Sequence, residues 1–345
     1  MKNLKGALMF AQSGGPTSVI NASAAGVFIE GLKSEAVTAV YGAAHGIKGV
    51  LNEEFYDISK EDPKELELLK YTPSSALGSV RYKLKDAKVV DNDLYGTDHC
   101  PGYASAAKYI ATTIMEVNLD ARVYDTPMVC VIECMGRNAG WLTAAAKLAT
   151  YKGLGADLIY LPEVDFDIDK FVADVKGVCA KKNNKCIAVV SEGIHNKEGK
   201  LICEVLGETG ARDSFGHAQL GGVATTLANL IKEKTGFKTR GIELSLMQRC
   251  GAHLASKVDV EETFRAGREA VKAAVRGVTD KMVIYERAEG ETYKCKFKLM
   301  PLELAANTEK RVPLEWIINN GTYVSDEFVK YALPLIQGDC KAPLE

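Results

Sequence analysis

Two aspartates that flank an asparagine, Asp91-Asn92-Asp93, form the sharpest chemical feature of this sequence. The apolar pair Val89-Val90 precedes them, so the pattern predicts the polar end of a buried strand. One carboxylate at this spacing can take a proton from an attacking hydroxyl while the other helps to hold Mg²⁺, usually through water. Aspartate and asparagine are also common in helix caps and turns, so a purely structural role stays open at this point.

A second feature is the glycine pair Gly14-Gly15, which follows an apolar run and precedes a helical pattern. Paired glycines at such a junction let backbone N–H groups approach an anion, and the helix N-terminus adds its partial positive charge. The pair therefore predicts a phosphate cradle, although a tight turn without a ligand is an equal alternative. The segment matches neither G-x-G-x-x-G nor G-x-x-x-x-G-K-[ST], which disfavours a dinucleotide-binding fold and a Walker-type NTPase.

Polar residues also follow two other apolar runs. Met135, Gly136 and Arg137 come directly after one run, and Glu192 comes directly after another. Ligands of α/β proteins bind beyond the carboxyl ends of parallel strands. At such a place an arginine can meet an anion, and a carboxylate can accept hydrogen bonds from sugar hydroxyls. These residues are therefore candidate ligand contacts.

Four arginines lie at expected loop positions near strand ends: Arg81, Arg137, Arg240 and Arg249. The last two flank a strand that we expect at residues 241–246. A phosphorylated substrate requires such a set, because a guanidinium group binds phosphate through two parallel hydrogen bonds. Any one of these arginines alone is more often a surface residue.

The elements that must position these residues alternate between apolar runs and helical patterns, which predicts an α/β fold with parallel strands covered by helices on both faces. Near-continuous apolar runs are typical of such strands. We expect strands at residues 7–11, 37–41, 129–134, 158–161, 187–191 and 241–246, and helices from residue 62, over 216–235 and over 258–277. Two antiparallel edge strands are expected at residues 282–287 and 293–299.

The composition is that of a globular protein of roughly two domains, with 345 residues of which 47% are hydrophobic. A net charge of -2 creates no field that would draw the chain to nucleic acid or to an acidic membrane surface, so anions must be met by local clusters. The nine cysteines show no metal-binding spacing and indicate free thiols in a reducing cytoplasm. No membrane span or cleavable leader is apparent, so we expect a cytoplasmic protein.

Six segments, taken in this order, resemble the phosphofructokinase family: Gly14-Gly15, Leu77-Gly78-Ser79-Val80-Arg81, Val90-Asp91-Asn92-Asp93, Met135-Gly136-Arg137-Asn138, Glu192-Gly193 and Gln248-Arg249. The resemblance implies two doubly wound, Rossmann-like parallel-sheet domains that face a central active-site cleft. It implies a donor domain of residues 1–103 plus about 250–310, and a sugar-phosphate domain of residues 104–249 plus about 311–345.

The resemblance also implies a role for each matching residue. Asp91 resembles the base that takes the proton of the 1-hydroxyl of fructose 6-phosphate, and Asp93 resembles its companion carboxylate. The implied sugar-phosphate contacts are Met135, Gly136, Arg137, Glu192, Arg240 and Arg249, the last two on the 6-phosphate. The implied donor-phosphate site consists of Gly14, Gly15 and Arg81.

Lys88 bears on the choice of phosphoryl donor. ATP-using members of the family carry glycine three residues before the catalytic aspartate, whereas pyrophosphate-using members carry lysine. A lysine there can stabilise charge on the transferring or leaving phosphate, and its bulk disfavours ATP. The chain thus resembles the pyrophosphate-dependent branch, with fructose 6-phosphate and pyrophosphate as substrates, Mg²⁺ as cofactor and a homo-oligomer, by default a dimer, as the assembly. An ATP-dependent kinase is the alternative within the family.

The sequence departs most strongly from the family pattern between Ala87 and Lys88. The family carries roughly fifty residues there, about the size of a βα unit that includes a donor loop. Loss of a buried strand would expose apolar faces and leave backbone groups unpaired. We therefore expect the natural chain to hold this segment, so that the two Cα atoms lie well beyond the ~3.8 Å of a trans peptide. A chain that truly lacks the segment would favour a catalytically silent sugar-phosphate binder.

Overall fold

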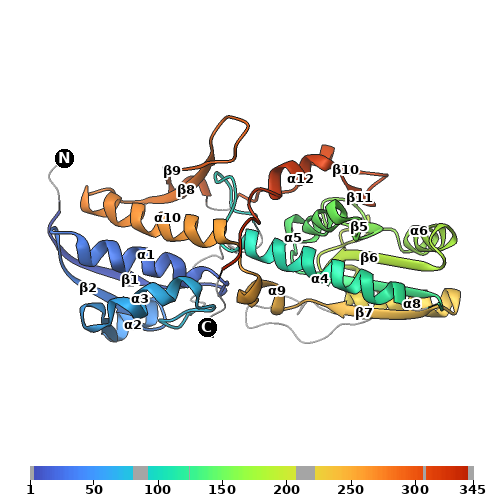
Figure 1. Cartoon of the computed structure of the whole chain (residues 1–345), viewed down its shortest axis with the longest axis horizontal. Coiled ribbons are helices and arrows are strands. Elements are labelled where there is room, and N and C mark those ends of the chain that lie inside the picture. The colour runs from blue at the N-terminus through green and yellow to red at the C-terminus, as the bar shows by residue number, and fades with distance from the viewer. Residues whose placement is uncertain (1–3, 81–91, 124, 207–221, 306–307, 341–345) are drawn as a thin grey trace. The chain divides into compact units, whose positions relative to one another are not determined.

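The computed structural model describes residues 4–80, 92–123, 125–206, 222–305 and 308–340. The chain divides into two compact units (Figure 1). Unit 1 comprises residues 1–106, 249–310 and 334–345, and unit 2 comprises residues 107–248 and 311–333. The expected domain bounds differ from these mainly at the C-terminus. Residues 334–345 belong with unit 1, where Ser256 Oγ donates a hydrogen bond to Leu335 O at 2.6 Å.

Unit 1 is built on a three-stranded sheet. Strand β1 (Gly6–Ala11) lies parallel to β2 (Val37–Ala43), and β3 (Phe55–Asp57) pairs antiparallel with β2. The remaining elements before residue 80 are α1 (Ile20–Lys33), α2 (Ile47–Asn52), the 3-10 turns Ile58–Lys60 and Leu69–Tyr71, and α3 (Pro63–Leu68). The helix expected from residue 62 is confirmed: the Asp62 carboxylate accepts a hydrogen bond from Lys64 N at 2.8 Å.

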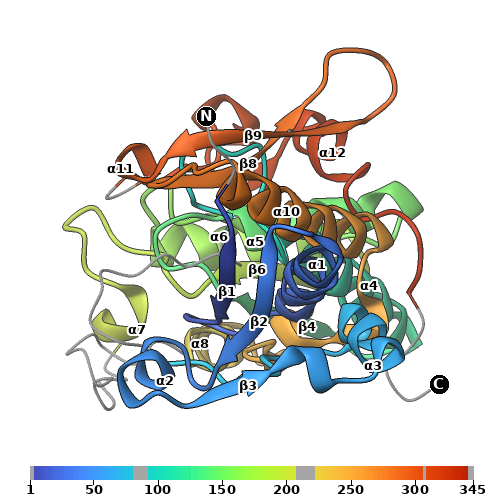
Figure 2. The ribbon, with the colours of Figure 1, turned by 90° about the vertical axis from the view of Figure 1, so that its left-hand side faces the viewer.

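The second segment of unit 1 joins the first through a close helix pair, in which α1 packs against α10 (Lys257–Val275) as Figure 2 shows. Glycine makes this approach possible, because a Cβ atom on Gly267 would overlap the backbone oxygen of Ser23. The second segment begins within α9 (Met247–Cys250) and also contains the 3-10 turn Ala252–Leu254 and α11 (Leu302–Ala305). The helix expected at residues 258–277 is confirmed by α10.

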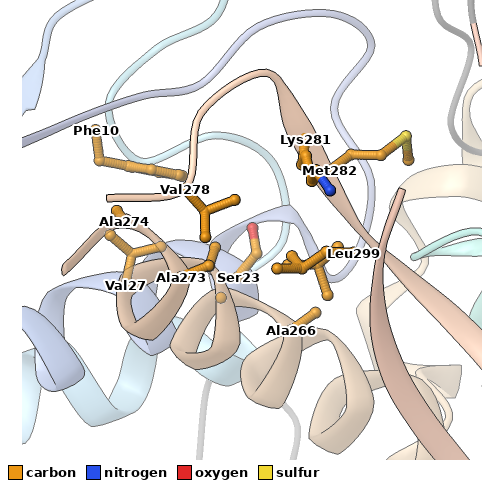
Figure 3. Close-up of a pocket in the computed structure, with 13 residues that line it drawn as sticks. Phe10, Ser23, Val27, Ala266, Ala273, Ala274, Val278, Lys281, Met282 and Leu299 are labelled. Atoms are coloured by element: carbon orange, nitrogen blue, oxygen red, sulfur yellow. The ribbon is translucent and has the colours of Figure 1, made fainter. Parts of the chain in front are cut away.

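An apolar cavity of about 360 Å³ lies between α1, α10 and an antiparallel hairpin formed by β8 (Lys281–Arg287) and β9 (Cys295–Pro301). Phe10, Val27 and Leu299 are among its lining residues (Figure 3). Strand β1 borders this cavity and, within the described residues, pairs on one edge only. Its side chains alternate between exposed and half-buried, so β1 is not the strand buried on both faces that its apolar sequence predicts.

Unit 2 contains a fully parallel four-stranded sheet in the order β5-β6-β4-β7. The strands are β4 (Met128–Cys134), β5 (Leu158–Tyr160), β6 (Lys185–Ser191) and β7 (Lys238–Glu243). Every residue of β4 is buried, because helices cover both faces of this central strand. The expected strands at 129–134, 158–161 and 187–191 are confirmed.

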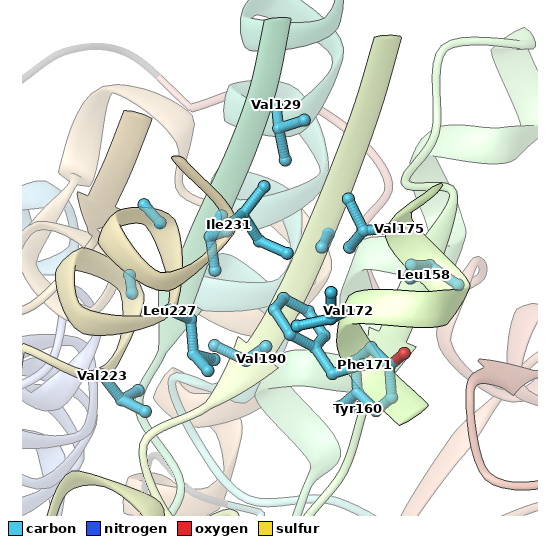
Figure 4. Close-up of a cluster of buried hydrophobic side chains, with 14 of the residues drawn as sticks. Val129, Leu158, Tyr160, Phe171, Val172, Val175, Val190, Val223, Leu227 and Ile231 are labelled. Carbon is cyan, nitrogen blue, oxygen red and sulfur yellow. The ribbon is translucent and has the colours of Figure 1, made fainter. Parts of the chain in front are cut away.

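One face of this sheet packs against α6 (Ile168–Lys181) and α8 (Val223–Thr235), as Figure 4 shows. Val190 of the sheet, Phe171 of α6 and Leu227 of α8 belong to this core. The other helices of unit 2 are α4 (Tyr103–Val123), α5 (Trp141–Ala144) with the 3-10 turn Ala145–Lys152, α7 (Ile202–Val205) and α12 (Asp326–Ala332). A 3-10 turn (Leu314–Trp316) leads into the short pair β10 (Ile317–Ile318) and β11 (Tyr323–Val324).

The expected strand at residues 241–246 is wrong in its bounds, because β7 begins at Lys238 and ends at Glu243. β7 is an edge strand that begins with three polar residues, so a search for continuous apolar runs misses its start. The chain turns away at Ser245, which has a φ of 41°. Arg240 therefore lies inside the strand and does not flank it.

Candidate functional site

The glycine pair of unit 1 lies between β1 and α1, in contact with a second segment of the predicted site. Gly14 has a φ of 87°, a conformation that favours glycine. Its carbonyl oxygen accepts a hydrogen bond from Ser79 Oγ at 2.6 Å, and Ser13 Oγ donates to Val80 O at 3.0 Å. The fold thus brings together two segments that are separated by sixty-odd residues in the sequence, about the span of two βα units.

Two buried amide side chains, those of Gln12 and Asn21, form hydrogen bonds that fix these two segments. Gln12 Oε1 accepts hydrogen bonds from Ser75 Oγ at 2.7 Å and from Leu77 N at 3.1 Å. Gln12 Nε2 donates to Asn21 Oδ1 at 3.0 Å, which also accepts from Ala76 N at 2.8 Å. Sequence reasoning missed both residues. Their signal was weak: two amides beside a glycine turn, one in the preceding loop and one in the first turn of α1.

Three predicted residues of the donor and catalytic group, Arg81, Lys88 and Asp91, lie outside the described residues, as does the junction of Ala87 with Lys88. Asn92 is buried with a φ of 57°, and its Oδ1 accepts a hydrogen bond from Cys100 N at 2.8 Å. Asp93 is half-buried, and its carbonyl oxygen accepts from Lys310 N at 2.7 Å. These two residues form part of a turn whose shape is fixed by hydrogen bonds.

A network of charged side chains follows this turn in the sequence and connects it to two distant segments. Arg287 donates two hydrogen bonds to Asp98, each at 3.1 Å, and His99 lies between Asp98 and Glu262 at 2.9 Å from each. Burial opposes the charges, but hydrogen bonds from His99 and Arg287 lower the pKa of Asp98 to about 2. Burial likewise opposes a charged His99, and its two carboxylate partners outweigh burial and raise the pKa of His99. Sequence analysis did not identify this network, since its members come from three distant segments.

In unit 2 the structure brings the predicted sugar contacts together at the carboxyl ends of β4 and β6. Gly136 N donates a hydrogen bond to Glu192 Oε1 at 3.1 Å, and Ser191 Oγ donates to Gly136 O at 2.5 Å. Gly136 has a φ of 129°, and a Cβ atom there would lie 2.5 Å from Ala139 O. Only glycine fits this position, which orients the adjacent Arg137.

Two buried residues to which the sequence analysis gave no role support this group. Gln248 Oε1 accepts a hydrogen bond from Met135 N at 3.2 Å, and its Nε2 donates to Ser245 O at 2.9 Å. Glu133 is the last but one residue of β4, and its Oε2 accepts a hydrogen bond from Ala224 N at 3.1 Å. Burial raises the pKa of Glu133 to about 7. A carboxyl group with such a raised pKa, close to the predicted sugar contacts at the end of β4, is typical of a functional region.

The two arginines predicted for the 6-phosphate belong to different units. Arg249 lies in α9 and opens the second segment of unit 1. Arg240 is exposed in β7 of unit 2, level with Cys130 of β4. Since Cys134 ends β4, Arg240 lies four strand positions, or about 13 Å, before that carboxyl end. Within unit 2, Arg240 is therefore not brought together with Gly136 and Glu192.

The described residues also bear on metal binding, disulfide bonds and membrane spans. Among them, no group of three or more His, Cys, Asp or Glu side chains is arranged to hold a metal ion, and Asp93 is the single expected ligand present. All nine cysteines lie in the described part of the chain and carry thiols, as expected. No described helix has the length and hydropathy that crossing a membrane requires.

Comparison with known proteins gives consistent results. A family model described as Phosphofructokinase matches residues 86–274. Two similar curated relatives are named pyrophosphate–fructose 6-phosphate 1-phosphotransferase. The protein of Halomonas elongata is 36% identical, and the alignment covers 97% of this chain and 93% of the relative. The protein of Xanthomonas campestris is 37% identical, and the alignment covers 98% of this chain and 93% of the relative. The crystal structure of a pyrophosphate-dependent phosphofructokinase from Nitrosospira multiformis matches with a TM-score of 0.85 at 34% identity, over 97% of this chain and 93% of that chain.

The matched relatives also include residues that this chain does not have. The alignment with the Halomonas protein spans 395 positions, more than the 345 residues of this chain. The relative therefore has residues at positions where this chain has none. Identity near 35% over almost the whole chain, together with the family model and the structural match, gives one conclusion: the chain belongs to the phosphofructokinase family, with its relatives in the pyrophosphate-dependent branch.

Proposed function

We propose that this protein transfers a phosphoryl group from pyrophosphate to the 1-hydroxyl of fructose 6-phosphate, giving fructose 1,6-bisphosphate and phosphate. The observation that carries the proposal is the near full-length similarity to proteins named for this reaction. The grouping of Met135, Gly136 and Glu192 at one sheet edge supports it, because this is where an α/β fold offers polar groups to a sugar phosphate. The bond that forms is between the 1-oxygen and phosphorus, and the bridging bond of pyrophosphate breaks.

Asp91 is the proposed general base, which takes the proton of the 1-hydroxyl as the oxygen attacks. Asp93 is the companion carboxylate, and its negative charge favours transfer of that proton to Asp91. Phosphoryl transfer depends mainly on positioning and charge stabilisation. Arg137 therefore acts as a catalytic cation beside the reacting groups, and the glycine next to it fixes its backbone.

The sugar phosphate is held by groups of both charges. The Glu192 carboxylate, oriented by the Gly136 N–H, accepts hydrogen bonds from sugar hydroxyls. Met135, fixed by Gln248, covers the sugar ring. Arg240 and Arg249 are the proposed partners of the 6-phosphate. Arg240 lies level with Cys130, before the carboxyl end of β4 where Gly136 and Glu192 meet.

On the donor side, Gly14 and Gly15 offer backbone N–H groups to pyrophosphate, and Arg81 and Lys88 neutralise its charge. The hydrogen bond from Ser79 to the Gly14 carbonyl fixes the shape of this loop. Lys88 occupies space and supplies charge that disfavour a nucleotide. Unit 1 is thus the proposed donor domain, and unit 2 the proposed sugar-phosphate domain.

A divalent metal, proposed to be Mg²⁺, fits this chemistry because pyrophosphate is a polyanion and Mg²⁺ binds mainly through phosphate oxygens and water with one or two carboxylates. The described residues offer Asp93 for this purpose and no complete ligand set. When bound, the metal would neutralise charge on the donor phosphates. We further propose a cytoplasmic homo-oligomer, by default a dimer.

The alternatives are an ATP-dependent kinase and a silent sugar-phosphate binder. Purified protein should be assayed with fructose 6-phosphate and Mg²⁺, with either pyrophosphate or ATP as donor, and calorimetry should measure binding of fructose 6-phosphate alone. We expect turnover with pyrophosphate. Turnover with ATP alone would show that the donor assignment is wrong, and binding without turnover would support the silent binder.

A further inference from the structure

The turn that follows the proposed general base is closed by a single lysine from a distant segment of unit 1. Lys310 N donates a hydrogen bond to Asp93 O at 2.7 Å. The ammonium group of the same residue donates to Thr97 O at 3.1 Å and to Asp98 O at 2.7 Å. Lys310 therefore connects the start of the segment 93–98 to its end.

The neighbours of Lys310 strengthen this connection. Glu309 forms an antiparallel bridge with Leu94, so residues 309–310 run alongside the turn in a fixed register. On the far side, Asp98 is bound through its carboxylate to Arg287, while its carbonyl oxygen accepts from Lys310. The carboxylate and the backbone carbonyl group of Asp98 are thus held by two different basic residues.

A charged group is an expensive choice at this position. Burial of an ammonium group is unfavourable unless hydrogen bonds compensate for the lost hydration. Nζ donates to two neutral carbonyl oxygens, and burial lowers the pKa of Lys310. An apolar side chain of similar length could fill the same space without this cost, but it could not bind the two carbonyl groups. The geometry of the turn is what the lysine supplies.

We propose that Lys310 is a positioning residue that holds residues 92–98, which directly follow the proposed base Asp91 in the sequence, in the geometry required for phosphoryl transfer. The inference rests on the proposed function, in which Asp91 is the base. Asn92 and Asp93, which follow Asp91 directly, are fixed by hydrogen bonds from Cys100 and Lys310. Without the lysine, residues 93–98 lose the hydrogen bonds that join their two ends. The residues that follow the base are then no longer fixed.

The test compares three variants with wild-type protein: Lys310→Met, Lys310→Arg and the control Lys298→Met. Lys298 is an exposed lysine of unit 1 that pairs with Glu286, so its replacement matches the chemical change away from the turn. Misplacement of a reacting group by about 1 Å costs on the order of 10²-fold in rate. We expect kcat of Lys310→Met to fall by about this factor, with KM for fructose 6-phosphate and the melting temperature close to wild type.

Lys310→Arg should regain much of this loss, because its guanidinium can donate to both carbonyl groups, and Lys298→Met should match wild type. A Lys310→Met variant with wild-type kcat would overturn the inference. The inference would also fail if Lys310→Arg had no higher kcat than Lys310→Met and both variants had lost the same thermal stability. That result would indicate a purely structural role.

A second readout separates this inference from the proposed function. Hydrogen exchange of the backbone amides of residues 92–100 should be faster in Lys310→Met than in wild type and unchanged in Lys298→Met. If wild-type protein has no turnover with pyrophosphate, the proposed function fails, and the exchange result still decides whether Lys310 closes the turn. Unchanged exchange in Lys310→Met would overturn the inference in either case.

Discussion

Single hydrogen bonds from buried polar side chains fix several of the candidate site residues. Gln12 and Asn21 fix the loops beside Gly14, and Gln248 fixes Met135. None of these three carries a charge, so they set the backbone geometry without competing for phosphate. Charged groups are then left for the substrates, which suits a reaction in which positioning and electrostatics supply most of the catalysis.

Replacement of the proposed base gives the first prediction. Asp91→Ala should lower kcat by ~10²- to 10⁴-fold, the usual contribution of a general base. Binding of fructose 6-phosphate should remain close to wild type, because the residue is needed for proton removal more than for affinity. Steady-state kinetics and calorimetry measure the two quantities. A variant that keeps more than about a tenth of the wild-type rate, which is less than a general base contributes, would show that Asp91 is not the base.

The raised pKa of Glu133 predicts how stability depends on pH. Burial raises this pKa from 4.5 to about 7, so the folded state holds the proton more tightly than the unfolded state. The stabilisation is fully present below pH 4.5 and is lost as pH rises through 7. Glu133→Gln removes the titration. At pH 8 the variant should therefore exceed wild type in free energy of unfolding by at most about 3 kcal/mol.

Urea denaturation of both proteins at pH 5 and pH 8 checks this expectation. Glutamine can still accept the hydrogen bond from Ala224 N, so little change is expected at the lower pH. Equal loss of stability at both pH values would contradict the assigned pKa and indicate that the Glu133 contact acts through packing.

At the scale of elements, the close pair of α1 and α10 links the two main segments of unit 1. Gly267→Ala should lower the free energy of unfolding by about 1–3 kcal/mol, the usual cost of overpacking, because the new methyl group meets Ser23 O. The matched control is Gly177→Ala in the exposed part of α6, where nothing lies within 4 Å of the added Cβ. Alanine there should raise helix stability by up to about 1 kcal/mol. Equal effects of the two changes would contradict the proposed helix contact.

Sequence patterns predicted the buried elements better than the edges. Strands β4 and β6 of unit 2 and the helix α10 follow from apolar runs and helical spacing. The start of β7 was missed because an edge strand needs no continuous apolar run, and β1 is more exposed than its sequence indicates. The grouping of Gly136 with Glu192 was predictable from strand ends. The contacts of Lys310 and His99 were not, since they join segments more than a hundred residues apart.

For the whole molecule, each unit is assembled from more than one stretch of chain. Unit 1 contains the glycine loop, Asp93 and Lys310, and unit 2 contains Met135, Gly136 and Glu192. The proposed reaction therefore needs residues of both units, and neither unit alone should catalyse it. This division of labour agrees with the similarity to relatives along nearly the full chain.

Transfer between the two named substrates is the central claim, and ³¹P NMR of the reaction mixture observes it directly. Wild-type protein would be mixed with fructose 6-phosphate, pyrophosphate and Mg²⁺, without nucleotide. The account predicts that the pyrophosphate signal falls while the signals of phosphate and of the 1-phosphate of fructose 1,6-bisphosphate rise in equal amounts. An unchanged pyrophosphate signal, in a sample whose fructose 6-phosphate is shown by calorimetry to be bound, would contradict it.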